Sequence, residues 1–466
     1  MLFSSIPFLY YFLPCVLILY FIAPRQLKNT VLLVSSLVFY GWGEPVYLLL
    51  MIASISVGYL SALLIARSSS QKFRKAVMTV GVVISLSFLG YFKYADFLLE
   101  NFSAVTGISV ELLNIALPIG ISFYTFQSLS YIVDVYRDNV SVQKNIINLS
   151  TYIAMFPQLI AGPIVRYSDI ESRLTERKTT VEGFSLGVRR FVLGLSKKVL
   201  IANTLGELCD IFKTSDEKSV LFFWIYAASY CLHVYFDFSG YSDMAIGLGR
   251  ILGFDFPENF NYPFISASIT EFWRRWHMTL GSWFRDYVYI PMGGNRVGKF
   301  RHLINIFTVW MLTGLWHGAS WNFVVWGLYF GILLIIEKFF LLKYMKKSKV
   351  LSHFVVLLLV AISFVIFDSA TLSEAVHSIG SLFGAGNLPF VTEETLYYLR
   401  SFAVSLILGL IGATPVVRNA VNTLKKRTSV NRILNVVEPV LMVILLIAVT
   451  AYLVDGSFNP FLYFRF

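Results

Sequence analysis

The sequence predicts an all-α polytopic membrane protein, and three observations support this fold class. Of its 466 residues, 57% are hydrophobic and only 14% are charged, and the mean hydropathy is +0.69. A soluble domain of ordinary composition carries about 25% charged residues. Apolar stretches long enough to cross a bilayer as helices recur from one end of the chain to the other. We therefore expect residues 1–466 to form a single integral membrane domain.

About eleven or twelve segments have the length and composition of transmembrane helices. They lie near residues 4–23, 29–43, 45–66, 76–93, 113–134, 184–204, 219–238, 302–317, 319–342, 351–367, 396–415 and 434–455. With these spans, most Lys and Arg residues fall in loops on one side of the membrane, which is the positive-inside pattern. The loops near Lys75, Lys347 and Lys426 are then cytoplasmic, and both chain termini lie outside.

The net charge of +11 does not indicate a nucleic-acid-binding protein, because the basic residues form short clusters between apolar spans. Nucleic-acid binding would require a continuous basic patch or stripe. The three cysteines, Cys15, Cys209 and Cys231, are too widely spaced for a disulfide framework or a metal motif. We expect membrane lipids as partners, and neither nucleic acid nor a bound metal.

Two segments do not fit as simple spans. Residues 149–164 are apolar, but the basic stretches on either side must share one face of the membrane, so we expect this segment to be re-entrant. Pro157 and Pro163 would break a helix there, and irregular backbone at membrane depth requires covering protein or a water-filled cavity. We therefore expect a central pocket or tunnel. Residues 266–289 interleave aromatic and charged side chains, which predicts a helix that lies along the interface or plugs the bundle.

Two of the six histidines are candidates for chemistry. His317 lies in an apolar turn between two spans and is flanked by two glycines and two tryptophans. Neutral imidazole can accept a proton from a hydroxyl near neutral pH, as acyl transfer to an alcohol requires. The alternative for His317 is an interfacial histidine hydrogen-bonded within a tryptophan belt. His277 follows Arg274 and Arg275, which could equally face lipid head groups.

Two further features allow a functional and a structural interpretation. Asp237 and Asp243 end a span; with His233 they could hold a metal, but polar anchoring of the bundle explains them better. The turn Ile290–Arg296 could hold a phosphate with its amides and Arg296, or could be a plain cytoplasmic turn. The sequence has no Gly-x-Ser-x-Gly elbow, which favours direct attack by the acceptor hydroxyl over a serine nucleophile of this chain.

Several blocks together resemble the membrane-bound O-acyltransferase family. They are Asn259–Pro263, Glu271–His277, Trp283–Tyr287, Ile290–Arg296 and Trp316–Gly318, within a signature core of about residues 115–340. The glycine pair in Ile290–Arg296 is similar to the bacterial alginate O-acetyltransferase branch, which includes enzymes acting on cellulose and peptidoglycan. The ending 459–466 is also similar to this branch. One departure is Asp368, where the branch suggests an arginine.

The resemblance implies that His317 is the catalytic general base and His277 the second signature residue. Acetyl-CoA is the implied donor, with no bound cofactor. We expect donor contacts from Trp273, Arg274, Arg285, Arg296 and Trp316. From the predicted topology we expect His277 near the cytoplasmic end of a tunnel and His317 near the outer end, with separable kinetic roles. A bulky side chain at Gly318 should then block acceptor access alone.

The implied reaction moves an acetyl group towards hydroxyls of an extracytoplasmic polysaccharide or peptidoglycan. The resemblance also implies a separate secreted or membrane-anchored transferase as partner, and a place in the bacterial cytoplasmic membrane. Two alternatives remain at this point. One is a D-alanyl transferase of teichoic acids, and the other is a transporter or flippase, which would also use a re-entrant segment beside a cavity.

Overall fold

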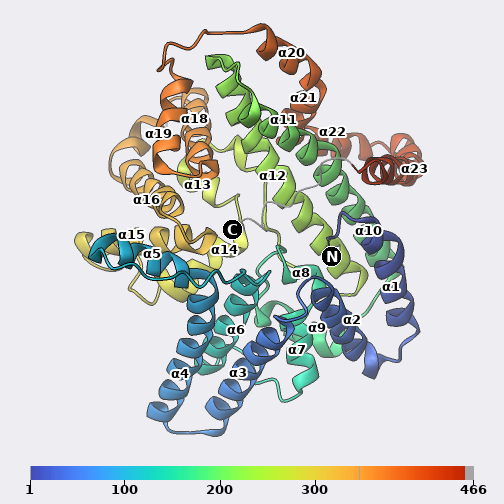
Figure 1. The fold of residues 1–466 in the computed structure, drawn as a ribbon. Helices are drawn as coiled ribbons and strands as arrows, with labels where there is room; N and C mark the ends of the chain where they lie inside the picture. The colour runs from blue at the N-terminus through green and yellow to red at the C-terminus, as the bar shows by residue number, and fades with distance from the viewer. Residues whose placement is uncertain (1, 346, 457–466) are drawn as a thin grey trace. The chain divides into compact units, whose positions relative to one another are not determined.

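The computed structural model describes residues 2–345 and 347–456, and these residues form helices joined by turns and loops (Figure 1). No β-strand occurs among them. The predicted all-α class is therefore confirmed. The ending 459–466, which carried part of the resemblance, lies outside the described residues.

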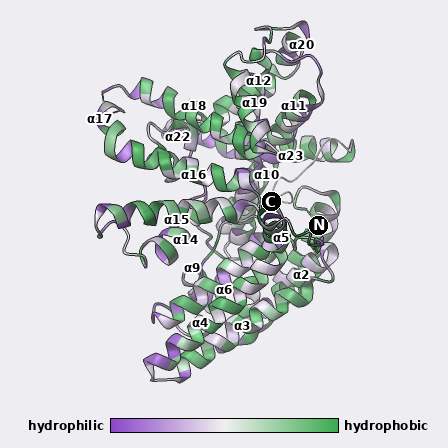
Figure 2. Ribbon diagram, turned by 60° about the vertical axis from the view of Figure 1, so that its left-hand side comes forward, coloured by the Kyte–Doolittle hydropathy of each residue, from purple (hydrophilic) through white to green (hydrophobic). Residues whose placement is uncertain are grey.

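Within the described residues, six helical segments are long and apolar enough to cross a membrane by length and composition. They are Leu48–Arg67, Gln71–Thr106, Val220–Ile251, Trp321–Leu341, Lys349–Asp368 and Thr428–Val454. The bent pair Glu393–Ser401 and Ala403–Gly412 would make a seventh. Hydrophobic residues dominate most of these helices, while hydrophilic residues are frequent at helix ends and in loops (Figure 2). Each of the seven overlaps a predicted span, and the other predicted spans coincide with helices that are shorter or less apolar.

The chain divides into two compact units, the first formed by residues up to Phe191 together with Met244–Pro257. Its helices are α1 (Leu13–Ile22), α2 (Lys28–Gly43), α3 (Leu48–Arg67), α4 (Gln71–Leu89), α5 (Ala95–Thr106), α6 (Ile121–Tyr136), α7 (Ile146–Ala154), α8 (Phe156–Leu159), α9 (Tyr167–Glu176) and most of α10 (Val181–Ser196). Helices α3, α4 and α6 pack against one another. Small residues permit this close approach, since a Cβ on Gly81 would lie 2.5 Å from the Ser61 hydroxyl.

The segment predicted to be re-entrant is broken and buried. It consists of α7 and the single turn α8, separated at Met155, and residues 151–165 are all buried. The break is stabilised by polar contacts, since Ser36 accepts a hydrogen bond from the Phe156 amide at 3.0 Å. The side chain of Gln158 likewise donates to the Tyr152 carbonyl at 2.5 Å. Surrounding protein therefore covers this segment and supplies hydrogen-bond partners for its irregular backbone, as a broken helix at membrane depth requires.

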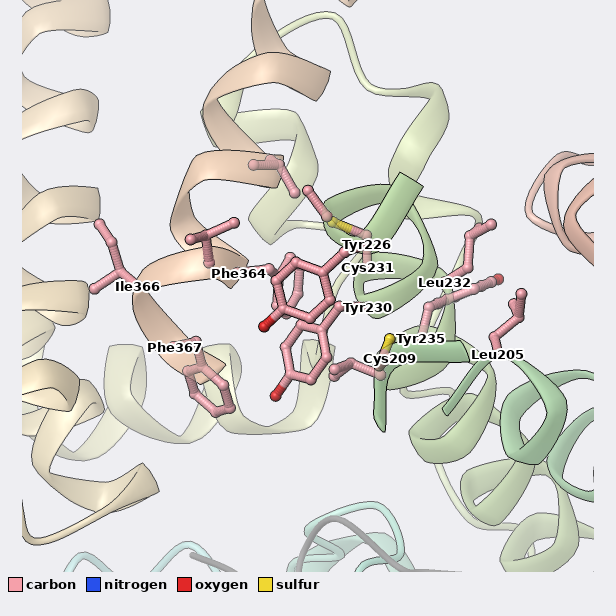
Figure 3. Packing of buried hydrophobic residues seen from close by; sticks show 14 of the residues in the cluster. Leu205, Cys209, Tyr226, Tyr230, Cys231, Leu232, Tyr235, Phe364, Ile366 and Phe367 are labelled. Atoms are coloured by element: carbon pink, nitrogen blue, oxygen red, sulfur yellow. The ribbon is translucent and has the colours of Figure 1, made fainter. Parts of the chain in front are cut away.

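The second unit contains Val192–Asp243 and the chain from Glu258 onward. Its helices are α11 (Asn203–Thr214), α12 (Val220–Ile251, whose last turns belong to the first unit), α13 (Ile269–Trp273), α14 (Met278–Phe284), α15 (Lys299–His317), α16 (Trp321–Ile336), α17 (Leu342–Met345), α18 (Lys349–Asp368), α19 (Leu372–Leu382), α20 (Glu393–Ser401), α21 (Ala403–Gly412), α22 (Val416–Lys425) and α23 (Thr428–Val454). Buried side chains of α11, α12 and α18 meet in its core (Figure 3).

Five stretches of wider π-helical turn interrupt or extend these helices. They are Phe8–Phe12, Gly90–Tyr94, Lys197–Ala202, Arg285–Tyr289 and Glu337–Leu341, and two short 3₁₀ turns lie at Arg25–Leu27 and Pro263–Ile265. Such bulges shift the register of the side chains that follow them. The turn Glu337–Leu341 matters below, because its first residue holds the segment that carries His277.

Candidate active site

The helical hairpin of α15 and α16 places His317. The helices approach so closely that a Cβ on Gly314 would lie 2.2 Å from the Phe323 carbonyl oxygen. A Cβ on Gly327 would lie 2.2 Å from the carbonyl oxygen of Trp310. Only glycine permits this backbone contact, which is a common way for membrane helices to associate. The hairpin therefore fixes the end of α15, where His317 is the last helical residue.

His317 is buried among aromatic rings. Its ring centroid lies 5.0 Å from those of Trp316 and Trp326 and 5.4 Å from that of Phe367, all in edge-to-face arrangements. Burial at 7% exposure agrees with the expected position in an apolar turn. Gly318 touches this packing, because a Cβ there would lie 2.2 Å from the ring of Phe323. A bulky residue at Gly318 would thus also disturb the hairpin itself, and the expected selective block of acceptor access stays a prediction.

Residues 266–289 form three short helical pieces. The prediction of one interfacial or plugging helix is wrong in this respect, because the chain turns between α13 and α14 and continues as Arg285–Tyr289. The Ser268 hydroxyl accepts a hydrogen bond from the Glu271 amide at 3.0 Å at the start of α13. Buried Glu337 accepts hydrogen bonds from the amides of Ile269 and Thr270, at 2.5 and 3.1 Å. A carboxylate at a helix N-terminus is stabilised by the amides and the helix dipole.

His277 lies in the turn between α13 and α14 and has an unusual backbone conformation. Its φ of +43° is in the left-handed region, which a non-glycine residue adopts at a cost in free energy. The side chain is 1% exposed. Backbone strain of this kind persists where surrounding contacts determine the conformation, and it occurs often at functional sites. The conformation therefore supports a functional interpretation of His277 over a lipid-facing one.

A hydrogen-bond network orients the imidazole of His277. Its Nδ1 lies 3.0 Å from Oδ1 of Asn259, which also accepts from the Thr279 hydroxyl at 2.9 Å. Asn259 in turn donates to the Ser242 hydroxyl at 3.1 Å. Because the Asn259 oxygen only accepts, Nδ1 carries the proton and Nε2 carries the lone pair. Nε2 is buried and has no hydrogen-bond partner among the described residues.

The two histidines pack against one indole. The ring centroid of His277 is 5.6 Å from that of Trp316, and the ring of His317 is 5.0 Å from the same centroid. The hydrocarbon core of a bilayer is about 30 Å thick. The expected separation of His277 and His317 to opposite ends of a tunnel is therefore wrong, because both belong to one buried site. The predicted topology assigned each histidine to a side of the membrane from the charge of its neighbouring loops. Loop charge does not report how far each segment folds into the protein interior.

The proximity of the imidazoles affects their protonation. His277 lies outside the spanning helices, and its burial lowers its pKa well below the ordinary histidine value, while the neighbouring His317 lowers it further. A buried cation without a paired anion is costly, so neutral imidazole is favoured. The site therefore supplies uncharged His277 beside His317 at neutral pH.

The residues expected to contact the donor differ in exposure. Trp316 is buried against both histidines, and Trp273 is half-buried against Trp326, with 5.7 Å between the Trp273 and Trp326 ring centroids. By contrast, the arginines lie at the surface, and Arg285 forms a two-pronged ion pair with Asp286 at 2.6 and 2.9 Å. The side chains of Arg274 and Arg296 are exposed as well. Donor binding by these residues stays a prediction.

The turn Ile290–Arg296 is held from within. The amides of Gly293 and Gly294 donate to the carbonyls of Ile290 and Tyr289, both at 2.9 Å, and the Arg296 amide donates to Gly293. Buried Asn305 of α15 donates to the carbonyls of Met292 and Gly294. Since these amides are already satisfied, the interpretation as an amide cradle for phosphate is wrong. Positive φ at both glycines, +99° and +57°, explains the glycine pair.

The aspartates Asp237, Asp243 and Asp368 of the second unit pair with lysines. Asp237 and Asp243 lie 2.5 and 2.6 Å from the ammonium groups of Lys198 and Lys197, which agrees with polar anchoring of the bundle. Asp368, the departure from the family pattern, pairs with Lys213 at 2.6 Å and accepts a hydrogen bond from the Tyr226 hydroxyl. A carboxylate therefore has a structural role at the end of α18, one residue after Phe367.

Sequence reasoning missed three residues that shape the site, namely Asn259, Glu337 and Trp326. Asn259 was recognised only as part of a motif. Glu337 had a usable signal, because a lone carboxylate inside an apolar span is costly and indicates a specific partner. Trp326 had none, since a tryptophan in an apolar helix is ordinary.

The fold and this site define the class of protein. The profile of the MBOAT, membrane-bound O-acyltransferase family, matches residues 137–367, a range that contains both histidines and every residue of the network around them. The chain belongs to the membrane-bound O-acyltransferase family and is an O-acyltransferase. This membership replaces the transporter alternative.

Three relatives bear on its place within the family. The probable alginate O-acetylase AlgI of Pseudomonas putida is 38% identical over 486 aligned positions, covering 100% of both chains. The peptidoglycan O-acetyltransferase of Helicobacter pylori is 32% identical over 88% of this chain and 85% of its own. The teichoic acid D-alanyltransferase of Bacillus subtilis is 31% identical over 50% of this chain and 61% of its own. Similarity over the full length thus extends to O-acetylases.

Proposed function

We propose that this protein transfers acetyl groups from acetyl-CoA to hydroxyls of an extracytoplasmic polysaccharide or peptidoglycan, with His317 as general base. The observation that carries the proposal is the pair of buried imidazoles that both pack against Trp316. Full-length similarity to a probable alginate O-acetylase and similarity to a peptidoglycan O-acetyltransferase support acetyl as the group transferred. The acceptors in the names of those relatives, alginate and peptidoglycan, support a polymer outside the cytoplasm as the acceptor.

The reaction follows from neutral imidazole chemistry. The acceptor oxygen attacks the thioester carbonyl carbon while His317 takes the hydroxyl proton. The tetrahedral intermediate then collapses, the carbon–sulfur bond breaks, and the proton passes from His317 to the departing thiolate. The products are an acetyl ester and free coenzyme A thiol. Burial excludes water, which would otherwise compete with the acceptor hydroxyl.

His277 is proposed to assist as a neutral hydrogen-bond acceptor. Its Nδ1 proton is committed to Asn259, and its unpaired Nε2 is buried beside Trp316. An acceptor in this position can orient a substrate hydroxyl towards the base. Because both imidazoles share one site, changes at His277 should affect the rate as well as donor use.

The donor and acceptor are proposed to arrive from opposite sides of the cytoplasmic membrane. Exposed Arg274 and Arg296 supply positive charge suited to the phosphates of coenzyme A, and Arg285 would join them by exchanging its ion pair with Asp286 for a phosphate. We also propose that a separate secreted or membrane-anchored transferase receives the acetyl group or presents the polymer. Both chain termini are proposed to lie outside, as the positive-inside pattern predicts.

The test is acetyl transfer by purified protein in lipid nanodiscs supplied with radiolabelled acetyl-CoA and a polysaccharide or peptidoglycan fragment. His317→Ala should lower the rate by on the order of 10²–10⁴, the usual contribution of a general base. His353→Ala is a matched control, since His353 lies near the start of α18, where its Nδ1 is 3.1 Å from the Ser266 carbonyl oxygen. Full activity of His317→Ala, with wild-type thermal stability, would remove His317 from its role.

A second candidate is D-alanyl transfer to teichoic acids, which the similarity to the Bacillus subtilis enzyme favours over half of the chain. Mass spectrometry of cell-surface polymers with and without the gene separates the two. Loss of acetyl esters supports the first proposal, and loss of D-alanyl esters supports the second.

A further inference from the structure

Trp326 of α16 carries a buried polar atom that packing does not explain. Its side chain is 2% exposed, and its indole Nε1 has no hydrogen-bond partner among the described residues. An indole N–H can only donate, so an acceptor must be supplied from elsewhere. Trp224 shows the usual solution in the same unit, since its Nε1 donates to the Leu382 carbonyl at 2.8 Å. Unpaired buried donors are rare and call for a specific explanation.

The position of Trp326 suggests what the acceptor is. Its ring centroid lies 5.0 Å from that of His317, and the two rings meet edge to face. Phe330 and Phe367 contact the same indole, with centroids at 5.3 and 5.2 Å. The adjacent Gly327 packs its backbone against α15, where an added Cβ would lie 2.2 Å from the Trp310 carbonyl oxygen. Trp326 is therefore held rigidly beside the proposed base.

This environment suits a donor that acts on developing negative charge. When a hydroxyl attacks a thioester, the carbonyl oxygen becomes an oxyanion within a few ångströms of the base that takes the hydroxyl proton. A preorganised donor that is unpaired before the reaction gains a partner as this charge forms. Apolar rings around the donor exclude water and strengthen the interaction. A neutral donor also avoids placing a second charge beside protonated His317.

We propose that the indole N–H of Trp326 is an oxyanion donor for acyl transfer. The inference deepens the proposed function and rests on it. The acceptor oxygen bonds to the carbonyl carbon, its proton moves to His317, and the Trp326 N–H donates to the oxyanion. As the carbonyl reforms, the carbon–sulfur bond breaks and the thiolate takes the proton from His317. Trp326 itself forms no covalent bond and changes no protonation state.

The test is Trp326→Phe in the full-length protein, because phenylalanine keeps an aromatic ring and removes the N–H. The turnover number should fall on the order of 10²–10³-fold, as for loss of one oxyanion donor. The Michaelis constant for acetyl-CoA should change little, since the ground-state thioester has little charge on oxygen. Trp310→Phe is the matched control, because Trp310 packs on Trp273 at 4.6 Å in the same aromatic cluster and is half-buried.

A second measurement separates a donor role from packing. The analogue of acetyl-CoA in which sulfur replaces the carbonyl oxygen offers a weak hydrogen-bond acceptor. The wild-type protein should prefer the oxygen substrate, and Trp326→Phe should lose most of this preference. Equal loss of rate on both substrates would mean that the indole only fills space, and the inference would be wrong.

Failure of this inference can be distinguished from failure of the proposed function. An active wild type with an inactive His317→Ala variant and a fully active Trp326→Phe variant would overturn the donor role alone. A wild type that transfers no acetyl group would overturn the proposed function and this inference together. If Trp326→Phe does not fold, Trp326 replaced by 7-azatryptophan keeps the ring shape and strengthens the N–H donor, and its turnover number should then be maintained or raised. A tenfold or larger decrease in turnover for folded 7-azatryptophan protein would contradict the proposal.

Discussion

The two histidines of the site are placed by different physical means. His317 ends a helix whose position is set by glycine contacts between α15 and α16, with backbone against backbone. His277 occupies a strained turn, and hydrogen bonds accepted by Asn259 and Glu337 hold the segment around it. The first arrangement depends on shape and tolerates no added volume. The second arrangement depends on polar partners. A change in side-chain volume should disturb it less than the loss of a hydrogen-bond acceptor.

This difference teaches that one buried site can fail in two ways. A change in the hairpin should cost folding, because a displaced helix cannot repack without moving its neighbours. A change in the polar network should leave the fold largely intact and cost rate, because the imidazole loses its orientation. Glu337 belongs to both, since it extends α16 and holds the start of α13.

The largest expected effect is that of Gly327→Ala. The new Cβ would lie 2.2 Å from the Trp310 carbonyl oxygen and 3.1 Å from Gly314, so the helices must separate. We expect destabilisation of roughly 3 kcal/mol, at the upper end for overpacking, because backbone cannot yield as a side chain can. Thermal unfolding in detergent measures it. Gly331→Ala, whose Cβ would meet Trp310 side-chain atoms at 3.4 Å, is the control and should be nearly neutral.

The next effect is that of Glu337→Gln. The carboxylate accepts from two amides and from the Thr270 hydroxyl, and an amide can present only one oxygen to these donors. Loss of charge-assisted hydrogen bonds should destabilise the protein by about 2 kcal/mol. Acyl transfer should also fall, since α13 leads into His277. The control Glu374→Gln replaces a carboxylate at an exposed cap of α19 and should change stability by under about 0.5 kcal/mol. Equal effects of the two changes would show that Glu337 is not specially held.

Asn259→Ala should mainly reduce the rate. The variant removes the acceptor that fixes the His277 tautomer and the donor to Ser242. If the misoriented imidazole of His277 stabilises the transition state less by about 1.4 kcal/mol, the turnover number falls about tenfold. Steady-state kinetics with acetyl-CoA measures this. Asn261→Ala, two residues away and exposed, should retain wild-type turnover. An Asn259→Ala variant with full turnover would separate His277 from catalysis.

The smallest expected effect concerns pH. The folded protein holds the pKa of His277 well below its usual value, so the unfolded chain binds a proton that the folded chain does not. Stability should therefore fall as pH drops below about 6.5, by at most about 1.4 kcal/mol per pH unit from this residue. His277→Asn keeps a donor for Asn259, suits the left-handed backbone and cannot titrate. Its unfolding temperature should decline less between pH 7.5 and 5.5 than that of the wild type; an equal decline would assign the effect to other groups.

The sequence alone could predict the class of fold and could single out His317 and His277 as candidates. Long apolar runs in a chain with few charges can satisfy their backbone only as helices in a membrane, and the regular secondary structure of the described residues is indeed helical. His317 stood out because an ionisable side chain in an apolar turn is costly. Residues 149–164 stood out because proline and glycine interrupt an apolar stretch, and the structure breaks and buries it.

Only the tertiary structure decided which of these residues meet. Topology separated His277 from His317 by a membrane, whereas the folded chain sets both against Trp316. The physical reason is that periodicity and charge report the environment of a segment, but not how far a turn reaches into the bundle. Two other features were also visible only in the folded chain: the hydrogen-bonded amides of the Ile290–Arg296 turn and the unpaired N–H of Trp326. Whether a polar atom has a partner depends on residues distant in sequence, and packing alone brings them together.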